Sequence, residues 1–159
     1  MTDPFRRASR IADVELSEIL IISEAAAELK KAGRDVISLG TGEPDFPTPA
    51  PVIDAAHKAA LAGETTYTAT VGTAKLRAAI AADCARSNGY RPEQSEIIVC
   101  TGAKQVLFNA FFATLEPGDE VLVPAPYWTS YPDIITVCGG KPVAMPTTAG
   151  TGFRITPDQ

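Results

Sequence analysis

The second half of the chain alternates apolar, strand-like runs with helix-like runs, and this alternation restricts the fold more than any other feature. The strand-like runs are 96–100 (EIIVC), 121–124 (VLVP) and 141–146 (KPVAMP), and the helix-like segments are 104–115 and 128–137. The first two runs have the continuous apolar character of strands buried on both faces of a parallel sheet. Strands and helices that alternate with short connections indicate right-handed crossovers. The sequence therefore predicts an α/β fold that contains part of a parallel sheet.

The first half of the chain predicts helices separated by loops and extended segments. Ile19, Ile22, Ala26 and Leu29 recur at helical spacing within 13–31, and Gly33 follows as a C-cap. The other segments are a strand-like run at 35–40, a proline-rich loop, a helix from the N-cap Thr48 to Gly63, an extended stretch at 65–73 with Gly72 as its hinge, and a helix from Thr73 to Asn88 with Leu76, Ile80 and Cys84 on its inner face.

Composition excludes several classes of protein. The 159 residues include 14 Lys and Arg against 19 Asp and Glu, a net charge of -5, which argues against a nucleic-acid or anionic-membrane partner. The longest apolar run, 19–22, is too short to span a bilayer, and no apolar segment follows the N-terminal arginines directly. Three cysteines without a Cys-x-x-Cys pair indicate reduced, packed thiols. We therefore expect a cytosolic protein without a metal site.

The last residues of the sequence, TAGTGFRITPDQ, are turn-forming and follow a strand-like stretch directly. Nothing after them would complete the architecture. This ending raises the hypothesis that the chain is the front portion of a longer protein.

Two segments fall at the carboxyl ends of predicted strands, where open parallel sheets bind ligands. At Thr101-Gly102-Ala103 the glycine lets the backbone approach a ligand, and the following helix N-terminus favours an anion. Lys104 adds a positive charge in that first turn, which the helix dipole disfavours unless an anion compensates. The alternative is an ordinary strand-to-helix join without a ligand.

Trp128 is the one tryptophan of the chain, and it follows the next predicted strand in the segment APYWTSYP. Its indole can form the wall of a site for a flat ligand, or it can pack as core beneath the loop. A phosphate site one strand away from an aromatic platform suits a flat, phosphorylated cofactor.

Other motifs favour different chemistry only weakly. Gly40 and Gly42 give G-x-G, but prolines follow where the helix of a dinucleotide-binding fingerprint should begin, and no P-loop motif occurs. His57 is the only histidine and falls in a helix among alanines, so a histidine metal cluster cannot form.

Three stretches in this order carry a family resemblance: LGTGEPDFPTP at 39–49, TYTATVGTAKLRAAIA at 66–81, and the long segment from Val99 to Ile135. Together they resemble class I aminotransferases of the aspartate aminotransferase fold, which use pyridoxal 5'-phosphate (PLP). The resemblance extends from about Arg10 to Pro146. It implies the N-terminal portion of a fold-type I enzyme, with an arm, helix and substrate-side loop at 1–45 and part of the PLP-binding large domain at 46–159.

The resemblance also implies roles for individual residues. Trp128 matches the tryptophan that stacks on the cofactor ring and lies against the substrate, and Gly102, Ala103 and Lys104 match the turn that contributes to phosphate binding. Gly42 matches a position whose backbone contacts the substrate carboxylate. Tyr67 matches a tyrosine that reaches the cofactor phosphate of the neighbouring subunit, which implies a homodimer with shared sites. The small-molecule partners would be an amino acid and a 2-oxo acid.

The resemblance places the Schiff-base lysine, the ring-nitrogen aspartate and the carboxylate-binding arginine beyond Gln159, so no catalytic residue is assigned within this chain. Lys104 lies on the phosphate side, and Lys75 is in the first turn of a helix, so neither replaces the missing lysine. The segment IADVELSEILIIS also lacks a proline that the family carries before its first long helix, which leaves the substrate open, with aspartate as the first hypothesis. The alternatives are a truncated chain that binds PLP weakly or only within an assembly, and a nicotinamide-binding domain.

Overall fold

The computed structural model describes residues 7–12, 14 and 17–159 of the chain. The chain divides into two compact units. Unit 1 comprises residues 1–42 and 102–159, and unit 2 comprises residues 43–101. Each unit has its own helices and its own buried residues.

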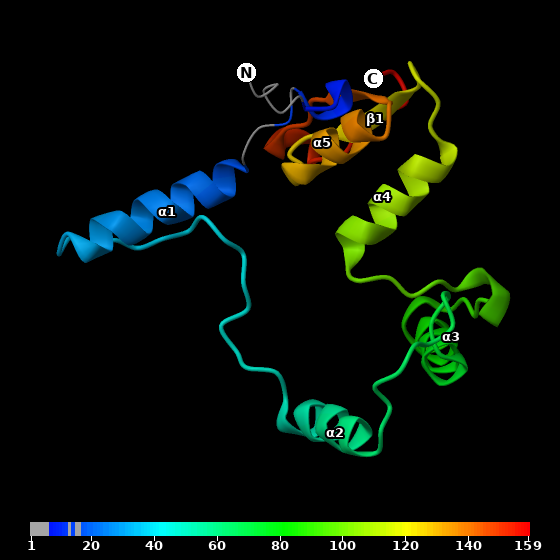
Figure 1. The fold of residues 1–159 in the computed structure, drawn as a ribbon. Helices are drawn as coiled ribbons and strands as arrows, with labels where there is room; N and C mark the ends of the chain where they lie inside the picture. The colour runs from blue at the N-terminus through cyan, green and yellow to red at the C-terminus, as the bar shows by residue number, and fades with distance from the viewer. Residues whose placement is uncertain (1–6, 13, 15–16) are drawn as a thin grey trace, which may run out of the picture. The chain divides into compact units, whose positions relative to one another are not determined.

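Unit 1 is organised around a parallel pair of strands. Strand β1 (Glu120–Pro124) pairs with β2 (Lys141–Met145), and the described residues contain no other strand. Helix α5 (Ser130–Val137) connects them and lies against both strands (Figure 1). Ile135 of this helix is 1% exposed, and Val123 of β1 and Met145 of β2 are buried as well. The α/β class and the parallel pairing predicted from the sequence are confirmed.

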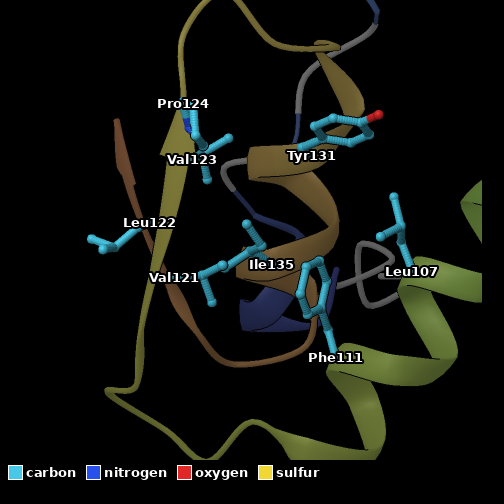
Figure 2. Close-up of a pocket in the computed structure, with 8 residues that line it drawn as sticks. All are labelled: Leu107, Phe111, Val121, Leu122, Val123, Pro124, Tyr131 and Ile135. Atoms are coloured by element: carbon cyan, nitrogen blue, oxygen red, sulfur yellow. The ribbon is translucent and has the colours of Figure 1, made fainter. Parts of the chain in front are cut away.

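The side chains of β1 alternate between the two faces of the pair. Figure 2 shows Val121 and Val123 directed toward α5, whereas Leu122 points away from it. Leu122 is 59% exposed, so β1 is covered on one face only. The prediction that this strand is buried on both faces is therefore wrong for this chain, because no described element packs on the face that carries Leu122.

Unit 1 also contains the α-helices α1 and α4 and the short 3-10 helices η1 (Ser9–Ile11) and η3 (Ala149–Thr151). Helix α1 covers Glu18–Lys31, and α4 covers Ala103–Thr114. Gly33 has a φ of 80° after α1, and the N–H of Arg34 donates to the carbonyl of Leu29 at 3.1 Å, which is a Schellman ending. The helices predicted at 104–115 and 128–137 are confirmed to within two residues. That at 13–31 is confirmed from Glu18, and its residues 13, 15 and 16 lie outside the described residues.

Unit 2 contains helices α2 (Ala50–Leu61) and α3 (Ala74–Asn88) and the short 3-10 helix η2 (Gln94–Glu96). The Thr73 hydroxyl caps α3 by accepting from the N–H of Leu76 at 3.2 Å, in agreement with a helix predicted to begin at Thr73. The buried side chains are Ala81 and Ile97. Of the inner face predicted for α3, Ile80 and Cys84 are partly buried, whereas Leu76 is 45% exposed.

Two predicted strands do not form. Residues 97–100 carry no strand, because unit 2 contains no strand that could supply the ladder of hydrogen bonds. The N–H of Val99 donates to Val71 at 3.1 Å instead. Residues 35–40 are irregular as well, and Gly40 lies against α1, where an added Cβ would be 3.1 Å from Ile22 Cγ2. The N-cap of α2 is Pro49, one residue after the predicted Thr48.

Large apolar side chains are exposed in both units. Ile37 and Leu39 are 86% and 91% exposed, and Phe46 is 83% exposed. Exposed apolar surface on this scale marks a site of association or an aggregation hazard. We conclude that much of the surface of both units is suited to being covered by further protein.

We therefore predict that the isolated 159-residue chain binds the dye ANS strongly and melts without a cooperative transition. The reason is that few apolar side chains are buried while a strand edge and many large apolar groups face water. Dye fluorescence and a thermal scan followed by circular dichroism measure this. A sharp, cooperative transition of a monomer would contradict the prediction.

Candidate functional site

The N-terminus of α4 begins at a glycine. Gly102 is the N-cap residue with φ of 82°, and it has no side chain with which to cap the helix. Ala103 and Lys104 form the first turn, whose N–H groups have no carbonyl partner within the helix. This end of α4 therefore has the backbone geometry and the dipole that favour an anion.

The loop after β1 is fastened to the end of β2. The N–H of Ala125 donates to the carbonyl of Met145 at 2.8 Å, and the carbonyl of Ala125 accepts a hydrogen bond from the Thr147 hydroxyl. Three residues later, the carbonyl of Trp128 accepts from the N–H of Tyr131 at 2.9 Å. The loop that carries Trp128 is thus held at both of its ends.

Lys104 and Trp128 come together in the structure. The Nζ atom of Lys104 lies 5.7 Å from the centroid of the Trp128 ring, within the range of a cation–π contact. The Trp128 side chain is still 43% exposed, so it is not a core residue. The contact joins the two segments that the sequence placed at neighbouring strand ends.

An apolar cavity of about 240 Å³ lies between α4, β1 and α5. Figure 2 shows Leu107 and Phe111 of α4 facing Tyr131 and Ile135 of α5 across it. The lining residues are Leu107, Phe111, Val121, Leu122, Val123, Pro124, Tyr131 and Ile135. The lining contains no charged group, so this cavity is suited to apolar side chains.

The other predicted site residues, Gly42 and Tyr67, are both exposed. Apart from the chain neighbours of Gly42, no atom of the described residues lies within 4 Å of the position that a Cβ would take on it. Tyr67 belongs to unit 2, is fully exposed and lines a shallow hollow with Thr65 and Thr66. The contact between Lys104 and Trp128 is the one that the structure establishes among the predicted site residues it describes.

Titratable groups near the strand pair have structural partners. The Sγ of Cys138 lies 3.7 Å from the carbonyl of Phe108, and burial raises the pKa of the Cys138 thiol. A hydrogen bond from Lys141 Nζ to Glu120 Oε1 at 2.7 Å raises the pKa of the Lys141 amine. These groups connect packed elements and are not directed at Trp128.

The part of the chain that the structure describes contains no candidate metal centre and no candidate membrane span. No group of three or more His, Cys, Asp or Glu side chains in that part could hold a metal ion. No helix in it is both long enough and apolar enough to cross a membrane.

Thr147 is the residue of this site that sequence reasoning did not identify. It contacts Ala125 across 22 residues of sequence, and no spacing or motif signals such a hydrogen bond. The cation–π contact of Lys104 was likewise not expected, although both of its members were singled out.

Comparison with known proteins gives consistent matches. A family model of aminotransferases of class I and II matches residues 34–159. The aspartate aminotransferase of Rhizobium meliloti is 54% identical over 152 residues, which cover 96% of this chain and 37% of the relative. The aspartate/prephenate aminotransferase of Cereibacter sphaeroides is 48% identical over 149 residues, covering 94% of this chain and 37% of the relative.

A solved structure matches the fold as well as the sequence. The crystal structure of the aspartate aminotransferase from Rhizobium meliloti has a TM-score of 0.92 and 53% sequence identity, covering 97% of this chain and 38% of that structure. The chain therefore spans less than two fifths of the length of these relatives.

We predict that Lys104→Ala makes Trp128 easier to quench with acrylamide, because the substitution uncovers one face of the indole. Lys75→Ala is the matched control, since Lys75 is also the second residue of a helix, α3. The contact is worth about 0.5 kcal/mol at an exposed site, so the increase should be partial. Equal quenching in the two variants would show that Lys104 does not cover the ring.

Proposed function

The chain belongs to the aminotransferases of class I and II, and from this membership we propose that it is the N-terminal part of a PLP-dependent enzyme that moves an amino group between an amino acid and a 2-oxo acid. The observation that carries the proposal is the half-exposed Trp128 indole beside the N-terminus of α4. An aromatic face next to an anion-binding helix end matches a flat ring that bears a phosphate.

The described residues fit PLP in chemistry. The first turn of α4, from Gly102 to Lys104, would hold the phosphate through its backbone N–H groups, with the positive end of the helix dipole directed at it. An indole has two faces, so Trp128 can present one face to the cofactor ring while Lys104 lies over the other. When bound, PLP supplies the electron-accepting ring that makes the α-proton of an amino acid removable.

The chain's own contribution is binding and orientation. The Gly42 backbone would bind the substrate carboxylate, and the absence of a nearby side chain leaves room for the substrate to approach. Trp128 would keep water from one side of the ring and fix its plane. Proton transfer requires residues that the family resemblance places outside these 159 positions, so the chain provides the stacking platform and part of the phosphate site.

We propose aspartate as the amino donor, because relatives at about half identity are named aspartate and aspartate/prephenate aminotransferases. We also propose the domain division at 45/46, with the PLP-binding large domain beginning at residue 46, and a cytosolic location.

The alternative is a truncated, non-catalytic product. Sequencing the reading frame beyond codon 159 distinguishes the aminotransferase from the truncated product. A continuing frame that encodes a suitable lysine permits an assay with aspartate and 2-oxoglutarate. A stop codon at that point means that the protein has no transaminase activity.

In the complete protein, we predict that Trp128→Ala weakens PLP retention about fivefold, because stacking is worth about 1 kcal/mol beyond area burial. The cofactor absorption band should also shift, since the ring loses its aromatic neighbour. Trp128→Phe, which keeps an aromatic face, should retain most of the affinity. An unchanged spectrum with ordinary turnover in Trp128→Ala would assign Trp128 a packing role only.

We further propose a homodimer in which Tyr67 reaches the cofactor phosphate of the neighbouring subunit, and the full exposure of Tyr67 supports this role. Tyr67→Phe should weaken PLP binding about tenfold or more, because a hydrogen bond to a charged group is worth about 1.5–3 kcal/mol. The loss should appear at protein concentrations where dimers form and vanish for dilute monomers. Thr66→Val is the neighbouring control. A loss that is independent of concentration would contradict the shared site.

A further inference from the structure

We infer that Thr147 is a positioning residue for Trp128, and this inference rests on the function proposed above. Its hydroxyl donates to the carbonyl of Ala125, which is three residues before the tryptophan. No residue role that follows from the family resemblance involves Thr147. The hydrogen bond joins the segment after β2 to the loop after β1, at the carboxyl ends of both strands.

Both backbone polar groups of Ala125 form hydrogen bonds with the short segment 145–147. Its N–H donates to Met145, and its carbonyl accepts from Thr147. Met145 is 6% exposed and pairs with Pro124, so the carbonyl that accepts from Ala125 belongs to the packed strand pair. The direction in which the chain leaves β1 is therefore set by residues 145–147.

The anchor provided by Thr147 is itself held in place. The carbonyl of Pro146 accepts a hydrogen bond from Gln159 Nε2 at 2.7 Å, and Gln159 Oε1 accepts from the N–H of Thr156 at 3.0 Å. Through these two hydrogen bonds, Gln159 connects Pro146 with Thr156. Thr147 and Ala125 are both partly buried, so loss of the hydroxyl would leave the Ala125 carbonyl with poor access to water.

The loop between these anchors is short. From Ala125 it passes through Pro126 and Tyr127 to Trp128, whose carbonyl accepts from Tyr131. The Tyr131 end is fixed by the start of α5, so the Ala125 end determines how the indole is presented over the N-terminus of α4. Releasing that end should let Trp128 sample several orientations and should weaken its stacking on a cofactor ring.

The test uses the complete protein that contains this chain, labelled with 5-fluorotryptophan and observed by fluorine NMR with and without PLP. The Trp128 signal is assigned by its disappearance in Trp128→Phe. We expect Thr147→Val to shift or broaden this signal in the PLP-free protein and to weaken PLP binding about fivefold, the usual effect of one lost hydrogen bond. Thr147→Ser, which keeps the hydroxyl, should restore both.

Thr136→Val is the matched control, because the Thr136 hydroxyl also donates to a backbone carbonyl, that of Pro132 at 2.9 Å, in a partly buried position. It should leave the Trp128 signal unchanged. An unmoved signal in Thr147→Val, or an equal movement in Thr136→Val, would overturn the inference. If Thr147→Val does not fold, Thr147→Ala is judged by the same criteria.

The two proposals fail in different ways. If the wild-type protein does not bind PLP but Thr147→Val still moves the Trp128 signal, the proposed function fails and the positioning role stands. If PLP binds to the wild type and Thr147→Val leaves both the signal and the affinity unchanged, the positioning role fails and the proposed function stands.

Discussion

The parallel pairing of β1 with β2 beneath α5 is the constraint on which unit 1 depends. Parallel strands that follow one another need a crossover, and α5 supplies it while burying Ile135 almost completely. The crossover brings the carboxyl ends of both strands to the same edge. Ala125 and Thr147 become neighbours for this reason, and the loop that carries Trp128 begins from that edge.

Most of the helices could be predicted because their signals are local. The Thr73 hydroxyl caps the helix that it precedes, and Gly33 ends the helix that it follows. The runs at 35–40 and 96–100 look as strand-like in sequence as the run at 121–124, yet only the last forms a strand. Strand formation requires a partner elsewhere in the chain, and local composition carries no information about whether that partner is present.

The residues of the candidate site also differ in how far the sequence alone could predict them. The N-terminus of α4 and the Trp128 loop were both predicted to lie at strand ends, but only the Trp128 loop follows a strand, because the run at 96–100 does not form one. Their contact through Lys104 required side-chain geometry. Thr147 could not have been found, because its partner lies 22 residues away and an isolated threonine has no distinguishing pattern. The roles of Gly42 and Tyr67 rest on family resemblance, and they stay predictions.

The amide of Ala125 closes the last hydrogen bond between the two strand ends and also begins the loop of Trp128. An amide in such a position exchanges with solvent deuterium only when the end of the ladder opens. Movement of the loop and fraying of the strand pair therefore share one opening event. We therefore expect the mobility of Trp128 to follow the opening of this strand end, where Met145 is buried.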